Sequence, residues 1–289
     1  MVPAAAGYWA GALRRSGNAG LVDRSNWESF MIHAGAPSSQ VILHVPHSST
    51  TIPTDVRRGI LLDDAALDLE LLRMTDAHTD RIAATAAADA KTTPWRFVND
   101  LSRLVIDPER FPDAREEMLA VGMGAVYTQT SGGTTLRAPD ALAEAGLIAR
   151  YFTPYASALP RLVDERINAC GAATIIDVHS FPSVALPYEL HSDLDRPEIC
   201  IGRDDTHTPQ RLVDAAVEAF SGFGSVGINE PFIGTYVPLA HYGTDLRVRS
   251  IMLEVRRDLY MDESSGAPIE GALRALGAAL ARLVDSAAE

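Results

Sequence analysis

Short apolar runs, each about as long as one strand, limit the fold of this chain more than any other feature. The runs lie at 41–45, 95–98, 104–106, 173–178, 198–201 and 248–255. Most are apolar at successive positions, as in strands buried inside a sheet that helices cover on both sides. Because helix-like segments separate the runs, the sequence predicts an α/β domain with a mainly parallel or mixed central sheet flanked by helices.

Helices are expected between these runs, at 64–89, 140–169, 209–221 and 266–286. In the first, apolar residues recur every three or four positions from Leu67 to Ile82, which predicts one continuous helix. The regular pattern begins at Val41. We therefore expect residues 1–40 to be an extension packed on a single α/β domain of residues 41–289.

The charge of the chain excludes several classes of partner. The net charge is −13, from 25 basic and 38 acidic residues. Neither nucleic acid nor an anionic membrane attracts such a protein over long range, so we expect neither as a partner. No run approaches the ~20 apolar residues that cross a bilayer. We expect a cytoplasmic protein, with Cys170 and Cys200 as free thiols.

Polar residues that are able to bind a metal or take part in catalysis lie at the ends of the apolar runs. They are His47, Asp107, Asp177, His179, Ser180 and Glu254. Ligands of α/β sheets bind beyond the carboxyl ends of the strands. We therefore expect two histidines and several carboxylates to meet at one edge of the sheet.

Two imidazoles and one carboxylate make a three-ligand zinc site that leaves a position for water. Zinc polarises a carbonyl and makes water a nucleophile near neutral pH. A second carboxylate then takes the proton of the water and passes it to the leaving amine, and Glu254 is placed for that role. No H-x-x-E or H-E-x-x-H motif is present, so spacing alone does not distinguish a zinc site from core histidines.

Six short motifs occur in a fixed order. They are Pro46-His47-Ser48, Thr75-Asp76, Ser102-Arg103-Leu104-Val105-Ile106-Asp107 with Arg110, Asp177-x-His179-Ser180, Gly202-Arg203, and Leu253-Glu254 with Leu259-Tyr260-Met261. Together the motifs resemble the N-formylglutamate amidohydrolase family. The resemblance implies a fold like that of the zinc carboxypeptidases and one zinc ion per chain. It also implies hydrolysis of N-formyl-L-glutamate to formate and L-glutamate, a late step in histidine degradation.

The resemblance also implies the metal ligands and the base. His47 and His179 match the ligand positions, and Glu254 matches the strand glutamate of the family. Asp76 matches the Thr-Asp pair and is the expected carboxylate ligand. Asp80, four residues later on the same face of the predicted helix, is the alternative.

A small anionic substrate is expected to meet a set of polar residues. They are Arg103, Arg110, Arg203, Arg256, Ser180, Asp107 and Asp177. Arginine binds a carboxylate through two parallel hydrogen bonds, and Arg103 is expected to act catalytically as well, on the scissile carbonyl. Arg256 should face the same way as Glu254, two residues earlier on the strand, and is expected to bind substrate or to pair with Glu254.

The sequence departs from the family beside the expected cleft. Asp107-Pro108-Glu109-Arg110 stands where an Asn near the last arginine is more usual. The acyl group and the amino acid are therefore open, and a carboxypeptidase-like hydrolase of another acylated amino acid or small peptide is an alternative. A non-catalytic metal-binding or ligand-binding protein on the same fold is a third possibility. A buried Glu254 argues against it, since simple binding has no need of a second buried carboxylate.

Overall fold

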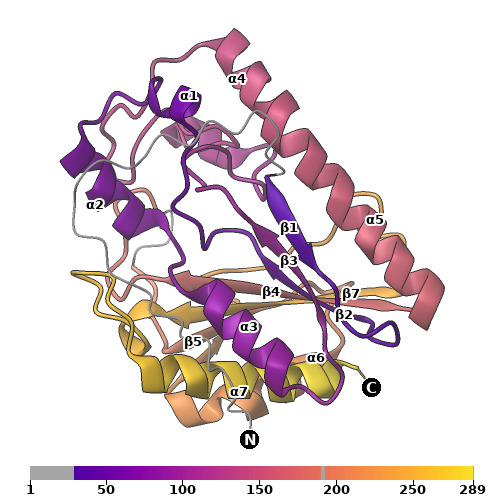
Figure 1. The fold of residues 1–289 in the computed structure, drawn as a ribbon. Coiled ribbons are helices and arrows are strands. Elements are labelled where there is room, and N and C mark those ends of the chain that lie inside the picture. The colour runs from indigo at the N-terminus through magenta and orange to yellow at the C-terminus, as the bar shows by residue number, and fades with distance from the viewer. Residues whose placement is uncertain (1–28, 190–192, 289) are drawn as a thin grey trace, which may run out of the picture.

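A seven-stranded mixed sheet lies at the centre of the computed structural model, which describes residues 29–189 and 193–288 (Figure 1). The strands are β1 (Phe30–His33), β2 (Val41–Val45), β3 (Trp95–Asn99), β4 (Ala173–Phe181), β5 (Ile199–Gly202), β6 (Val226–Ile228) and β7 (Val248–Arg256). Their order across the sheet is β1-β3-β2-β4-β7-β5-β6. The predicted α/β class with a mixed central sheet is confirmed.

Four neighbouring strands, β3, β2, β4 and β7, run parallel to one another. Strands β1 and β5 run antiparallel to their neighbours β3 and β7, and β6 follows the direction of β5. The carboxyl ends of β3, β2, β4 and β7 therefore meet at one edge, here called the carboxyl edge. Strand β5 runs away from that edge.

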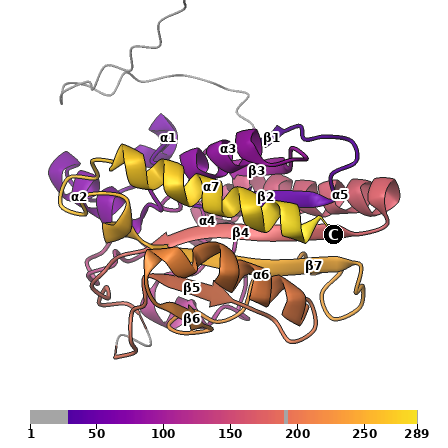
Figure 2. The ribbon, with the colours of Figure 1, turned by 90° about the horizontal axis from the view of Figure 1, so that it is seen from below.

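Helices cover both faces of the sheet (Figures 1 and 2). They are α1 (Thr54–Arg57), α2 (Asp64–Met74), α3 (Thr79–Asp89), α4 (Ala141–Leu147), α5 (Thr153–Cys170), α6 (Gln210–Phe220) and α7 (Glu270–Ala287), with short turns of 3-10 or π helix at 117–121, 148–152, 221–223 and 257–259. Leu43 of β2 belongs to the core beneath α3, α6 and α7, whereas its neighbour Ile42 belongs to the core beneath α5. Side chains on both faces are thus buried, which explains the unbroken apolar runs.

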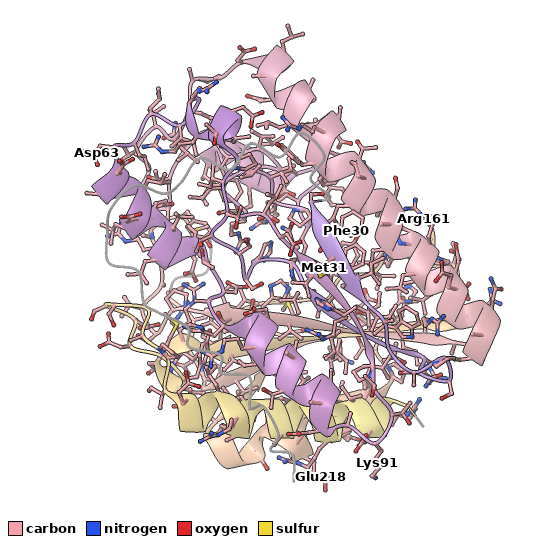
Figure 3. The ribbon with its side chains drawn as sticks, viewed as in Figure 1. Phe30, Met31, Asp63, Lys91, Arg161 and Glu218 are labelled. Atoms are coloured by element: carbon pink, nitrogen blue, oxygen red, sulfur yellow. The ribbon has the colours of Figure 1, made fainter. Side chains whose placement is uncertain are left out.

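Regular structure begins earlier than Val41. In β1, the ring of Phe30 stacks on Phe97 with centroids 4.9 Å apart, while the adjacent Met31 is exposed (Figure 3). Residues 29–40 therefore include an edge strand of the sheet. The rest of the expected extension, residues 1–28, lies outside the described residues.

The prediction of one helix over 64–89 is wrong, because α2 and α3 are separated at residues 75–78. Thr75 is extended, with ψ 134°, and His78 has a left-handed φ of 68°. Nε2 of His78 lies 2.9 Å from the carbonyl oxygen of Gly266 and donates to it. Neither glycine nor proline occurs at this break, and the helical spacing of apolar residues continues across it. The sequence pattern therefore did not reveal the break.

The predicted strand at 104–106 is also wrong. These residues form turns, and their side chains are buried against the long segment that follows, including Met118, Val126 and Tyr127. Strand β6 lies outside the apolar runs from which strands were predicted. Within residues 29–189 and 193–288, no helix is long and apolar enough to cross a bilayer.

Helices α3 and α7 approach closely at Gly277, where an added Cβ atom would lie 2.5 Å from Cβ of Thr85. We expect Gly277→Ala to lower the free energy of unfolding by about 1–3 kcal/mol, because the helices must separate. Gly271, on the same helix, has open space around its Cβ position. Gly271→Ala should leave stability equal or raise it by up to about 1 kcal/mol. Urea denaturation of both variants measures this, and equal effects would contradict the close approach.

Candidate active site

Strand alternation places polar residues of β2, β4 and β7 side by side on one face of the sheet. His179 of β4 is the register partner of Glu254 of β7, and Asp177 of β4 is the partner of His44 of β2. Val178, between the two β4 residues, belongs to the core of the opposite face. The polar residues therefore share the face that α5 covers, near the carboxyl edge.

Asp76 reaches this edge from the break between α2 and α3. Its backbone N–H donates to the carbonyl oxygen of His47, 3.0 Å away, in the turn that follows β2. Thr79, at the start of α3, donates through both N–H and Oγ1 to the carbonyl of Asp76. Asp76 is thus held by backbone contacts on both sides and is fully buried.

Three donor atoms from His47, Asp76 and His179 converge on one point. Nδ1 of His179 lies 3.3 Å from Nδ1 of His47 and 3.2 Å from Oδ2 of Asp76, and the His47–Asp76 separation is 3.7 Å. Donors bound at about 2.0–2.1 Å to one tetrahedral zinc lie about 3.3 Å apart. The three residues therefore fit the ligand set of a metal ion.

The chain also prepares His47 for such a role. Nε2 of His47 lies 2.9 Å from Oδ1 of Asp107 and donates to this carboxylate, which leaves the lone pair of Nδ1 free. Arg103 donates to the other oxygen of Asp107 over 2.8 Å, and Tyr127 donates to the same atom. Burial alone would raise the pKa of Asp107, but Arg103 and His47 hold it well below its usual range.

Arg257 performs the equivalent task for Asp76. Its Nη2 donates to Oδ1 of Asp76 over 2.9 Å, and its Nε donates to Oγ of Ser180. Burial alone would raise the pKa of Asp76, but contacts with His179 and His47 and the charge of Arg257 hold it well below its usual range. Asp76 therefore stays ionised, as a metal ligand must.

Glu254 stands beside this triad with its carboxyl group in the cavity. It is 8% exposed, and its Oε2 makes no hydrogen bond with any described residue. Burial raises the pKa of Glu254 to about 8, although His179 opposes the shift. A cation held by the triad would stabilise the carboxylate and lower that pKa toward neutrality. A carboxyl group poised near neutral pH is suited to proton transfer.

A cavity of about 360 Å³ opens over the triad and Glu254. Its remaining wall includes Arg73, Arg103, Arg110 and Arg257, the carboxylates of Asp107, Glu109, Glu117 and Glu189, and the apolar side chains of Met118, Phe181, Leu186, Phe232 and Ile233. This volume is in the range of small-molecule sites. The arginines give a local positive contribution within an acidic protein.

Comparison with known proteins identifies the family of this chain. Residues 39–261 match the model of the family described as N-formylglutamate amidohydrolase. The chain belongs to this family. Membership makes it an amidohydrolase by class, and the resemblance predicted from its motifs is confirmed.

Two solved structures share the fold of this family member. A crystal structure of N-formylglutamate amidohydrolase from Ralstonia eutropha JMP134 matches with a TM-score of 0.76 at 24% identity, over 91% of this chain and 98% of that one. A gene product of Agrobacterium tumefaciens matches with a TM-score of 0.64 at 20% identity, over 90% of this chain and 95% of that one. No curated protein matches the sequence.

Most residues predicted for the amidohydrolase site come together in the cavity wall. Those that line it are His47, Asp76, Arg103, Asp107, Arg110, His179, Ser180 and Glu254. Asp177 lies behind His179, with its Oδ1 3.0 Å from Nε2 of that ring. Asp76 is part of the convergent triad and Asp80 is not, since α3 begins after the break and carries Asp80 in its first turn.

Two predicted arginines are not brought to the cavity. Arg203 follows β5, which runs away from the carboxyl edge, and its guanidinium pairs with Asp205 at 3.1 Å. Arg256 pairs with Glu198 and Asp258, both at 2.8 Å, instead of with Glu254. The alternation of side chains along β7 ends here because a 3-10 turn begins at Arg257. Arg257, and not Arg256, therefore lines the cavity.

Sequence reasoning also missed Glu109. Its Oε2 lies 3.3 Å from Nε2 of His179 and 3.7 Å from Nδ1 of His47. Its Oε1 is buried without a hydrogen bond from any described residue. The departure from the usual Asn near Arg110 was the signal for this position, and a carboxylate there places another acid beside the triad.

We expect Asp76→Asn to weaken Zn²⁺ binding by more than the 10–100-fold that loss of an outer hydrogen-bond partner costs, because an amide is a poor ligand. Asp80→Asn removes the same charge from the next turn and should leave the dissociation constant unchanged. Competition with a chromophoric chelator measures both. Loss of binding in Asp80→Asn with binding retained in Asp76→Asn would contradict the assignment.

Proposed function

We propose that this protein hydrolyses the amide bond of an N-acyl amino acid, with N-formyl-L-glutamate as the first substrate to test, and uses one zinc ion held by His47, Asp76 and His179. One observation carries the proposal. Three converging donor atoms share the wall of one cavity with the buried carboxyl group of Glu254, whose Oε2 has no hydrogen-bond partner among the described residues. Family membership supports the class of reaction.

The donor set favours zinc among the common metals. Two imidazole nitrogens and one carboxylate oxygen are typical of zinc sites in hydrolases, whereas Mg²⁺ and Ca²⁺ prefer oxygen ligands alone. When bound, zinc polarises an amide carbonyl and makes water nucleophilic near neutral pH. Asp107 and Arg257 hold two of the ligands in place.

Proton transfer is assigned to Glu254. Its carboxylate accepts a proton from the attacking water as the C–O bond forms, and gives it to the amide nitrogen as the C–N bond breaks. The products are the free acid and the free amine, and the carboxylate is regenerated. Arg103, 12% exposed in the cavity wall, is assigned to the carbonyl oxygen, where negative charge develops.

Substrate carboxylates are assigned to cavity arginines. Arg110 has a side chain 27% exposed, and among the described residues its ion-pair partners are Asp107 at 3.9 Å and Glu116 at 3.4 Å. Arg73, exposed at the rim, is a second cation. Ser180 stays in the proposal as a polar lining group. The proposed role in histidine degradation and the cytoplasmic location remain predictions.

Glu254→Gln should keep zinc affinity and lower kcat by about 10²–10⁴-fold, because the amide cannot accept the proton. Glu165→Gln, on the exposed side of α5, is the matched control and should keep full activity. Zinc content and initial rates with N-formyl-L-glutamate measure the outcome. Unchanged turnover in Glu254→Gln would remove the assigned base, and no turnover in the wild type with bound zinc would favour a binding protein.

A second candidate substrate is an N-acyl amino acid without a second carboxylate, and Glu109 is the observation that favours it. Its carboxylate has an oxygen with no donor among the described residues and lies within 4 Å of both triad histidines. A negative charge there repels an anionic side chain of the substrate and attracts a hydrogen-bond donor.

A matched pair of substrates distinguishes the two candidates. N-formyl-L-glutamine differs from N-formyl-L-glutamate only in replacing the side-chain carboxylate by an amide. If Glu109 sets specificity, kcat/KM for the glutamine compound exceeds that for glutamate in the wild type, and Glu109→Asn reverses the order by roughly tenfold or more, the ratio that 1.4 kcal/mol of charge repulsion gives. If the wild type prefers glutamate and Glu109→Asn leaves the ratio unchanged, the second candidate fails.

A further inference from the structure

A buried chain of polar contacts leads away from the cavity behind His179. Oδ1 of Asp177 lies 3.0 Å from Nε2 of His179 and 2.8 Å from Nδ1 of His44. Nε2 of His44 in turn contacts the hydroxyl of Tyr155 on α5 at 2.5 Å. His44, Asp177 and Tyr155 are each at most 1% exposed, and none of the three lines the cavity.

The acceptor groups in this series of contacts determine which atoms carry the protons. An ionised carboxylate only accepts hydrogen bonds, so Nδ1 of His44 must donate to Asp177. A neutral His44 ring then accepts at Nε2 from the hydroxyl of Tyr155. Burial holds the pKa of Tyr155 well above its usual range, so that hydroxyl keeps its proton.

The distances between side-chain atoms distinguish this series of polar contacts from a second metal site. His44, Asp177 and Glu109 also offer three ligand atoms close together. However, the 2.8 Å between His44 and Asp177 is a hydrogen-bond length, shorter than the about 3.3 Å between two ligands of one zinc. The triad shows the opposite pattern, because its two Nδ1 atoms face each other at 3.3 Å. The separations in the His44 cluster therefore fit a set of hydrogen bonds better than a set of metal ligands.

We propose that His44 is a positioning residue that acts on the metal site through Asp177. By holding Asp177 in place, His44 keeps a carboxylate against Nε2 of His179. With a metal ion on the triad, the proton of that ring would lie on Nε2 beside Asp177, and Nδ1 would offer its lone pair to the ion. This inference rests on the proposed zinc site.

The contact at Nε2 is close but poorly aligned. Nε2 of His179 forms no hydrogen bond with any described residue, and Oε2 of Glu109 lies nearby at 3.3 Å. Two carboxylates thus surround one ring nitrogen. Nδ1 of His44 is within hydrogen-bond distance of Asp177 and lies 3.6 Å from Oε1 of Glu109. Loss of His44 therefore removes a hydrogen bond from Asp177, while Glu109 keeps its place in the cavity wall.

Two substitutions at His44 separate hydrogen bonding from packing. His44→Leu removes the donor to Asp177, and His44→Asn keeps an N–H near the Nδ1 position. We expect His44→Leu to weaken Zn²⁺ affinity by roughly tenfold, the lower limit for loss of an outer partner. His44→Asn should recover most of that loss. Competition with a chromophoric chelator gives the affinities without any assay of activity.

His207 supplies the matched control. It is also a fully buried histidine with two hydrogen bonds, to the carbonyl of Val248 and from the N–H of Gly243, and it does not line the cavity. His207→Leu should lower thermal stability as His44→Leu does, but leave Zn²⁺ affinity unchanged. Equal affinity in His44→Leu and wild type, or equal losses in His44→Leu and His44→Asn, would overturn the proposal.

A measurement on the unmodified protein covers the case in which His44→Leu does not fold. Nitrogen-15 NMR of the imidazole rings reports which nitrogen carries the proton. In zinc-loaded wild type, we expect His44 with its proton on Nδ1 and His179 with its proton on Nε2. The opposite tautomer at either ring would overturn the inference. Absence of Zn²⁺ binding in wild type would instead defeat the proposed function, and the tautomer of His44 in the metal-free protein would still test its hydrogen bond to Asp177.

Discussion

The backbone N–H of Asp76 donates to the carbonyl of His47, and this bond joins two parts of the chain that no strand pairing connects. It ties the break between α2 and α3 to the turn that follows β2. Asp76 thereby lies beside His47 of the turn and His179 of β4. The left-handed turn at His78 makes the approach possible, since it redirects the chain immediately after Asp76.

Charge alternation keeps the buried site ionised. Arg103, Asp107 and His47 form one series, and Arg257, Asp76 and His179 form another, so each carboxylate lies between a guanidinium and an imidazole. An unpaired charge at these depths would be strongly unfavourable, but each of these carboxylates accepts several hydrogen bonds. Glu254 stands outside both series, which is why its pKa rises while those of Asp76 and Asp107 fall. The same carboxyl group is therefore free to take and release a proton.

Much of the fold and part of the site could be predicted from the sequence. Apolar runs located β2, β4 and β7, and the position of His47, His179 and Glu254 at their ends followed from strand direction. The break at 75–78 could not be predicted, since neither glycine nor proline occurs there and tertiary contacts stabilise the turn at His78. Arg257 was missed because strand alternation favoured Arg256, and the direction of β5, which removes Arg203 from the cavity, depends on pairing partners that a single sequence does not reveal.

The connection between β6 and β7 contributes Pro231, Phe232 and Ile233 to the wall of the cavity, with Ile233 largely exposed. It carries none of the triad residues and not Glu254. This part of the cavity wall and the triad thus lie on separate stretches of the sequence. Insertions or substitutions in this connection would change which substrates fit the cavity without moving the triad or Glu254. Relatives with the same reaction could therefore differ in substrate.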